Sequence, residues 1–282
     1  MKNGDLPPWR RPWSDDPNSG IHTSLSTGTP YRGINQLLLQ VASKKYQSKW
    51  WGTFNQIAFN GGNVRRGEKA TKIVLWKPIQ RKRANEQGKE VEDSFLIMRE
   101  FAVFNIEQCD GLDKFQVGFA KPEVSNDERY EHADLVISSI GAEIRYGRNS
   151  AHYNPSSDTV CLPYRHQFES PESFYETAFH ELAHFSEHPT RLNWNRAEEG
   201  YQMGELIAEI SSCMMMGELG LSVTTNLTNH ASYLSHWLEG MGRDPKYIFK
   251  AASQASKVVD YLMTVRRTMS ELTEALDELI FA

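Results

Sequence analysis

The chain has 282 residues, of which 39% are hydrophobic and 24% charged, and its formal net charge is −5. This composition is typical of a globular protein and excludes a fibrous or disordered one, and no apolar run approaches the roughly 18 residues of a membrane span. The N-terminus has no apolar signal segment, and three scattered cysteines indicate free thiols in a reducing compartment. We therefore expect a cytoplasmic protein with no membrane partner.

Charge is distributed unevenly along the chain. Residues 1–120 hold 18 Lys and Arg against 12 Asp and Glu, whereas residues 121–282 hold 13 against 24. The first part is therefore basic (+6) and the second acidic (−11), which predicts two domains with different partners. The polar, Pro-containing stretch FAKPEVSNDE is the expected linker, so we place a basic domain at 1–120 and an acidic domain at 127–282.

The basic part has the pattern of a small α+β domain. An extended N-terminal arm is followed by a helix beginning near Gly33 and by a short helix in which Thr53 is the expected N-cap and Gln56 completes a capping box. The stretches ATKIVLWKPI and SFLIMREFAVFNIEQ are rich in strand-forming residues and predict two paired strands. The polar segment between them, QRKRANEQGKEVED, is expected to be a solvent-exposed loop.

The acidic part is expected to be mostly helical with a small sheet. A helix is predicted at 127–140, with Leu135 among its buried residues, followed by short strands at AEIRYG and AHYN and an edge strand at Thr159–Leu162. A helix capped by Ser170, with Pro171 in its first turn, comes next, and further helices occupy most of the remaining chain.

The helix after Ser170 contains the motif His-Glu-x-x-His. His180 and His184 are four residues apart, so a helix projects both imidazoles from one face, where they can bind one metal ion. Glu181 lies beside them and can act as a general base toward a water whose pKa zinc lowers to about 7. The motif therefore predicts a Zn²⁺ site of the hydrolytic type, with another divalent ion as the alternative.

A catalytic zinc ion requires a third protein ligand and one open position. A third histidine six residues beyond His184 is excluded, because that position is Thr190. Glu205 and Glu209 follow on a later predicted helix, one turn apart on the same face. We expect Glu205 to be the ligand and Glu209 to hydrogen-bond a ligand histidine, with the reverse assignment as the alternative.

The predicted edge strand offers a place for a substrate. An extended peptide that paired with Thr159–Leu162 would bring its carbonyl group to the metal.

A basic and aromatic segment precedes the metal motif. From Lys44 to Lys89 there are 12 Lys and Arg but only Glu68 and Glu86 as acids, with Trp, Phe and Tyr interleaved. Cations that neutralise phosphates and aromatic rings that stack on bases are typical of single-stranded nucleic-acid binding, although the rings could instead form a domain core. The candidate DNA contacts are Lys44, Lys45, Lys49, Trp50, Trp51, Phe54, Arg65, Arg66, Lys69 and Lys72.

Two sets of motifs resemble the ArdC-type antirestriction proteins over nearly the whole chain. The first comprises PYRGINQLLL and SKWWGTFNQIAFNGGNVRRGEKATKIVLWKP; the second comprises FHELAHFSEHPTRL, GELIAEISSCMMMGELGL, ASYLSHWLEG and IFKAASQASKVVDYL. The resemblance implies an N-terminal single-stranded-DNA-binding domain and a C-terminal gluzincin-like metallopeptidase domain. It also implies a role in protecting incoming plasmid DNA from host restriction during conjugation, with His180, Glu181 and His184 as site residues and the third ligand on the helix of Glu205 and Glu209.

Two functions remain as rival hypotheses. In the first, the chain is a DNA-bound metalloprotease that acts on a restriction enzyme subunit or another DNA-bound protein. In the second, it passively coats single-stranded DNA and its metal is structural, without hydrolytic activity. Removal of the Glu181 carboxylate distinguishes them, because only the first requires a general base.

Overall fold

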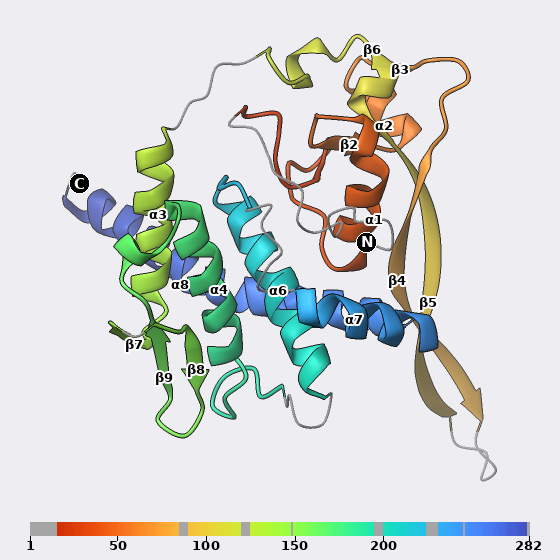
Figure 1. Ribbon diagram of the computed structural model, residues 1–282. Helices are drawn as coiled ribbons and strands as arrows, with labels where there is room; N and C mark the ends of the chain where they lie inside the picture. Colours follow the sequence, from red (N-terminus) through yellow and green to blue (C-terminus); the bar gives the residue numbers. More distant parts are fainter. Residues whose placement is uncertain are drawn as a thin grey trace.

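The computed structural model describes residues 16–84, 90–119, 125–147, 149–194, 200–223, 231–244 and 246–280. The protein has a mixed α+β fold (Figure 1), in agreement with the predicted class. We call the described residues up to 119 the N-terminal part and those from 125 onward the C-terminal part. Within the described ranges, no helix is both long and apolar enough to cross a membrane.

The N-terminal part is built on a four-stranded sheet. Its strands lie in the order β1-β2-β5-β4, and a separate two-stranded pair joins β3 and β6. In chain order the elements are β1 (Thr23–Ser24), α1 (Ile34–Ala42), β2 (Trp50–Gly52), α2 (Phe54–Phe59), β3 (Asn63–Val64), β4 (Thr71–Ala84), β5 (Glu90–Asn105) and β6 (Cys109–Asp110).

Strands β4 and β5 form a long antiparallel hairpin that projects along one side of the molecule (Figure 1). Pairing runs without a break from Thr71 opposite Val103 to Ala84 opposite Glu90. The prediction of two paired strands is confirmed, but the prediction that all of QRKRANEQGKEVED is a loop is wrong. Backbone pairing continues through most of that segment. The hydrogen bonds between two antiparallel strands satisfy the backbone N–H and C=O groups and do not depend on which side chains the strands carry.

Helix α2 forms as its sequence predicts. The Thr53 side chain accepts a hydrogen bond from the Gln56 N–H, and the Gln56 side chain accepts one from the Thr53 N–H, which completes the capping box. These two bonds satisfy N–H groups that a helix start would otherwise leave without partners.

The C-terminal part combines helices with a three-stranded sheet. Its elements are α3 (Asn126–Ser139), β7 (Glu143–Tyr146), β8 (His152–Asn154), β9 (Thr159–Leu162), α4 (Pro171–Phe185), α6 (Tyr201–Glu218), α7 (Ala231–Arg243) and α8 (Tyr247–Ile280). Most of the predicted elements are found, and Ala133, Val136 and Ile137 of α3 are buried. The prediction that Leu135 is buried is wrong, because its side chain is 64% exposed.

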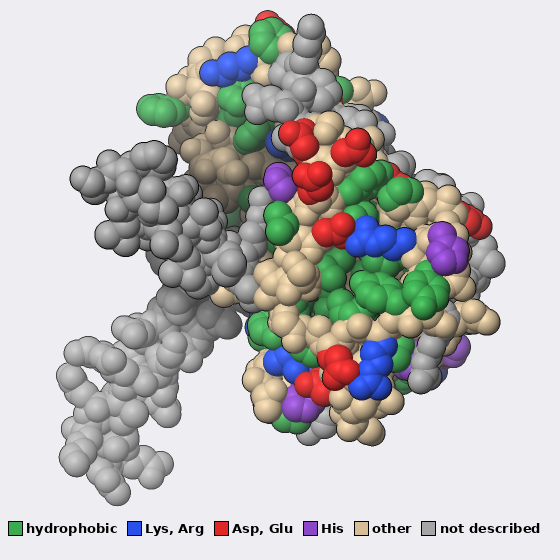
Figure 2. Space-filling view, turned by 90° about the vertical axis from the view of Figure 1, so that its left-hand side faces the viewer, with side chains coloured by type: hydrophobic (Ala, Val, Ile, Leu, Met, Phe, Trp, Pro, Cys, Tyr) green, Lys and Arg blue, Asp and Glu red, His purple; other side chains and the backbone are tan. Residues whose placement is uncertain are grey.

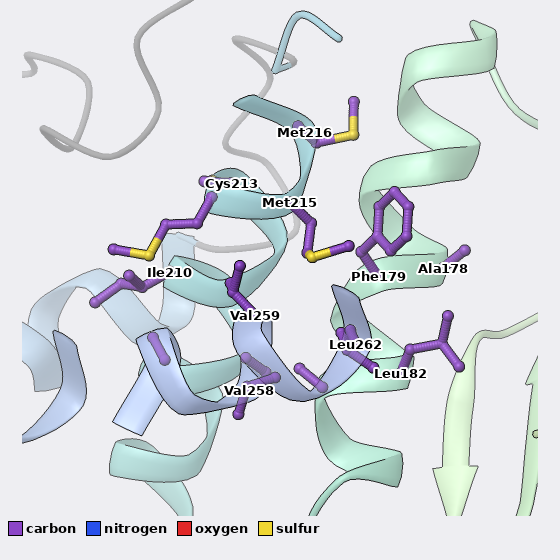
Figure 3. Packing of buried hydrophobic residues seen from close by; sticks show 14 of the residues in the cluster. Ala178, Phe179, Leu182, Ile210, Cys213, Met215, Met216, Val258, Val259 and Leu262 are labelled. Atoms are coloured by element: carbon purple, nitrogen blue, oxygen red, sulfur yellow. The ribbon is translucent and has the colours of Figure 1, made fainter. Parts of the chain in front are cut away.

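The main core lies where α4, α6 and α8 meet. Figure 3 shows Phe179 and Leu182 of α4, Met215 of α6, and Val258 and Leu262 of α8 packed together. Burial of such side chains is the main source of stability for the helices that carry the metal motif. On the face seen in Figure 2, some acidic side chains gather beside apolar ones, and others lie next to Lys and Arg side chains.

Helix α1 and the two residues before it contact the C-terminal part. Leu37 packs into the C-terminal core, and Arg32 forms an ion pair with Glu218 of α6. Gly33, at a φ of 58°, donates its N–H to Ser256 Oγ of α8 at 2.7 Å. The two parts therefore share a packed interface. The division of the chain into domains at 1–120 and 127–282 stays a prediction.

Candidate metal centre

Helix α4 presents both histidines of the motif toward α6. The helix begins as predicted, with Ser170 accepting from the Ser173 N–H and Pro171 in the first turn. Its spacing places the imidazole centroids of His180 and His184 4.9 Å apart. His184 is buried, and 16% of the His180 side chain is exposed.

Glu205 of α6 completes a triad with the two histidines. Its Oε2 lies 3.5 Å from His180 Nε2, and its Oε1 lies 3.5 Å from His184 Nε2. One potential ligand atom from each of the three residues lies within 4.8 Å of the other two. Two imidazole nitrogens and one carboxylate are a donor set that suits zinc and related divalent ions.

Glu209 lies one turn further along α6, on the other side of His180. Its Oε2 is 3.9 Å from His180 Nδ1, the nitrogen that faces away from Glu205. This arrangement favours Glu205 as the ligand and Glu209 as the residue that orients His180. Both carboxylates are buried, so their cost of desolvation has to be offset by such partners.

A second orienting carboxylate was missed in the sequence. Glu187 hydrogen-bonds His184 Nδ1 from one turn beyond it. His184 therefore has Glu187 on one ring nitrogen and Glu205 on the other. The signal was present, because His-x-x-Glu at the end of a helix can place the carboxylate within reach of the imidazole.

These carboxylates change the protonation of the site. Burial disfavours the charged imidazole, but hydrogen bonds to Glu187 and Glu205 outweigh it and raise the pKa of His184 to about 9. Burial acts in the opposite direction on Glu205, but its bonds to His180 and His184 lower the pKa of that carboxyl well below its usual range. A cation is therefore favoured at the centre of the triad, either as a proton or as a metal ion.

Glu181 lies beside the triad and contacts the sheet. The Tyr153 N–H of β8 donates to Glu181 Oε2 at 2.8 Å. Tyr153 is itself held by its hydroxyl, which donates to Asp158 at 2.8 Å, and Asp158 pairs with Arg191. The orientation of the Glu181 carboxylate is therefore fixed by the strand that lies against α4.

The prediction that Thr159–Leu162 is an edge strand is wrong. This segment is β9, and it lies in the centre of the sheet, parallel to β7 on one side and antiparallel to β8 on the other. Both of its edges are hydrogen-bonded, so a peptide cannot pair with it. The edge strand next to Glu181 is β8.

The predicted DNA contacts divide between core and surface. Trp51 is fully buried and donates its Nε1–H to His22 Nδ1 at 3.1 Å, so the prediction that it contacts DNA is wrong. Trp50 is half-buried and donates to Asn18, and the ammonium of Lys49 lies 5.1 Å from its ring centroid. Burial lowers the pKa of Lys49.

Arg65 also has a structural role. Its guanidinium donates to the carbonyl oxygens of Glu107 and Cys109 and pairs with Glu68, which ties the start of the β3–β4 connection to the segment that leads into β6. The remaining candidates with described side chains are exposed, namely Lys45, Phe54, Arg66, Lys69 and Lys72. The side chain of Lys44 lies outside the described part of the structure.

Family models match both parts of the chain. Residues 1–104 match the N-terminal domain of anti-restriction factor ArdC, and residues 131–254 match a zincin-like metallopeptidase. The structure is similar to crystal structures of the antirestriction protein ArdC from plasmid R388, in its metal-free form (TM-score 0.75) and its Mn(II)-bound form (TM-score 0.72). Both are 31% identical to this chain, and the first comparison covers 95% of this chain and 93% of that one.

Curated relatives include a longer and a similarly sized protein. A DNA primase TraC of Escherichia coli is 38% identical over 277 residues, which is 91% of this chain but 25% of the primase. Protein y4eC of Sinorhizobium fredii is 33% identical over 267 residues, which is 90% of this chain and 85% of that protein. The chain thus spans about a quarter of the length of that primase.

The fold and the triad define a zincin-like metallopeptidase domain joined to a second, α+β domain. Family models match both parts of the chain, and the similarity to the metal-free ArdC structure extends over nearly the whole of both chains. The chain belongs to the ArdC family of antirestriction proteins.

Proposed function

We propose that the chain binds single-stranded DNA through its N-terminal part and hydrolyses peptide bonds at a divalent-metal site in its C-terminal part. By this activity it would protect incoming plasmid DNA from host restriction during conjugation. The convergence of His180, His184 and Glu205, with Glu181 beside them, carries the proposal. The protein substrate would be a restriction enzyme subunit or another protein on the transferred DNA.

The residues present fit a metal ion. His180, His184 and Glu205 would hold it, and Glu209 and Glu187 would orient the two imidazoles. We propose Zn²⁺, with Mn²⁺ as the rival ion, because a related ArdC structure is Mn(II)-bound. Such an ion, when bound, polarises the carbonyl group of a substrate and acidifies a nearby water.

Glu181 would act as the general base and general acid. Its carboxylate is positioned by the Tyr153 N–H and is mostly withdrawn from solvent. It would accept a proton from the attacking water and deliver it to the leaving amine of the cleaved peptide bond. Proton transfer by a positioned group of this kind typically accounts for a factor of about 10²–10⁴ in rate.

Substitution of Glu181 by Gln tests this function. The variant should keep its metal content and its affinity for single-stranded DNA while losing protection of a restriction-sensitive plasmid in a conjugation assay. Immunoblots of the restriction subunits should show cleavage with the wild-type protein only. Glu169→Gln, which changes an exposed carboxylate just before α4, is the matched control and should behave as wild type.

The passive-coating hypothesis makes the opposite prediction for the same variant. If Glu181→Gln protects DNA as well as the wild-type protein does, peptide hydrolysis is not the basis of protection. A metal ion whose coordination positions are all filled by side chains, with none open to solvent, would also support the passive-coating hypothesis, because such an ion is structural.

A further inference from the structure

Helix α2 exposes aromatic rings to solvent. The Phe59 side chain is 91% exposed and that of Phe54 is 56% exposed. Asn55 and Ala58 lie between them on the same outward surface and are exposed as well. Almost complete exposure of a phenylalanine ring is unfavourable in an isolated protein, and an apolar surface of this kind commonly marks a binding site.

The support beneath these rings is rigid. Ile57, on the opposite face of α2, is fully buried, and the capping box of Thr53 and Gln56 fixes the start of the helix. After the helix the chain packs tightly, since a Cβ atom added to Gly62 would lie 2.6 Å from Leu112 Cγ. The rings are therefore held on a preorganised element, and a ligand does not have to bear the entropy of ordering it.

Positively charged residues follow α2 along the chain, from Arg65 to Lys72. Arg65 and Glu68 pair with each other, which leaves Arg66, Lys69 and Lys72 as exposed cations. In the described parts of the chain, no acidic side chain forms an ion pair with these three cations. The combination of exposed rings and exposed cations is complementary to a polyanion that carries planar apolar groups.

We propose that the outward face of α2 is the stacking surface for bases of single-stranded DNA, with Phe59 as its main contact. Phe54 lies on the other flank of the face, about 7.5 Å away along the helix axis, and would take a different base. Arg66, Lys69 and Lys72 bind the adjoining phosphates. This assignment rests on the DNA-binding half of the proposed function. It assigns to α2 the base-stacking role for which the sequence pattern had named Trp51 as one of the candidates.

The test compares binding to a strand with bases and to a strand without them. Affinities are measured by fluorescence anisotropy for an oligothymidylate of about 15 nucleotides and for an abasic strand of equal length, within the range of site sizes that single-strand binders cover. Phe59→Ala should weaken binding to the oligothymidylate about 5- to 150-fold, the equivalent of one lost stacking contact, and leave abasic-strand binding unchanged.

Three further variants complete the experiment. Phe59→Trp should retain affinity, because it preserves a stacking ring. Phe54→Ala should produce a smaller loss, again for the oligothymidylate only. Leu135→Ala removes an exposed apolar side chain from α3 in the acidic part and should change neither affinity.

Other outcomes would overturn the assignment. If the wild-type protein binds the oligothymidylate and Phe59→Ala binds it equally well, the stacking surface is elsewhere, although DNA binding stands. Equal weakening toward both strands would exclude stacking as the cause. A dimer that Phe59→Ala dissociates in sedimentation experiments would show a second copy of the chain as the occupant. If the wild-type protein binds neither strand, the proposed DNA-binding function itself fails.

Discussion

Helices α2 and α4 place the side chains of their two proposed sites in opposite ways. On α4, His184 and Glu181 are buried and have carboxylate or backbone partners, whereas on α2 the rings of Phe54 and Phe59 face solvent. A metal centre requires a few polar atoms fixed in a region that excludes most water, where electrostatic interactions are strong. A surface that binds a polymer has to be accessible instead, so the rings of the proposed DNA surface lie in solvent, and DNA binding would offset the cost of their exposure.

The two regions should therefore respond differently to substitution. In the metal centre, loss of one carboxylate leaves a buried imidazole without the negative charge that it pairs with. At the proposed DNA surface, loss of one ring should change the affinity for DNA and little else.

The largest effect is expected for Glu205, the proposed third ligand. Glu205→Ala should reduce bound metal from about one ion per chain to almost none, because two imidazoles alone hold zinc weakly. Glu209→Gln should keep the ion and weaken its binding about 10- to 100-fold, as is typical of residues that orient a ligand. Metal analysis after dialysis measures both. Loss of metal in Glu209→Gln but not in Glu205→Ala would reverse the two assignments.

The next effect concerns one buried and one exposed aromatic ring of the N-terminal part. Trp51→Ala should lower the free energy of unfolding by about 3–5 kcal/mol, since it removes a fully buried indole from the N-terminal core. Phe59→Ala should change it by less than about 0.5 kcal/mol. Urea denaturation followed by circular dichroism gives both values. Similar values for the two variants would contradict the division between core and surface aromatic residues.

Metal affinity should depend on pH through His184. Because the pKa of this residue is raised to about 9 in the metal-free protein, a proton has to leave before the ring can bind a metal ion. The apparent affinity should therefore fall about tenfold for each unit that the pH drops below 9. Competition with a chromogenic chelator at several pH values measures the slope, and a flat profile would contradict it.

The same shift has a stability consequence in the metal-free protein. The charged form of His184 is stabilised by Glu187 and Glu205, so its contribution is complete below pH 6.5 and is lost as the pH rises toward 9. In metal-loaded protein this dependence should be absent over that range, because the ion occupies the place of the proton.

The smallest effect is expected for a single phosphate contact. Affinity for single-stranded DNA should fall steeply with salt, and Arg66→Ala should reduce the slope of log K against log salt concentration by about 0.7. Arg65→Ala should instead destabilise the fold, because its guanidinium holds the carbonyl oxygens of Glu107 and Cys109. An unchanged slope in Arg66→Ala would show that this residue is not part of the proposed DNA surface.

Local features were determined by the sequence alone. The capping box at Thr53, the start of α4 at Ser170 and the projection of His180 and His184 from one face depend on residues within one or two turns of each other. Interactions at that range are present in any chain with the same local pattern. The α+β class and the family resemblance were likewise available from motifs that are contiguous in sequence.

Long-range packing decided the rest. Both Glu205 and Glu209 fit the sequence pattern, and only the way α6 lies against α4 brings Glu205 to Nε2 of both histidines. The central position of β9, between β7 and β8, depends on pairing that its own residues do not specify. Neither does composition distinguish the buried ring of Trp51 from the exposed ring of Phe59, because burial is a property of the neighbours that the fold brings to each side chain.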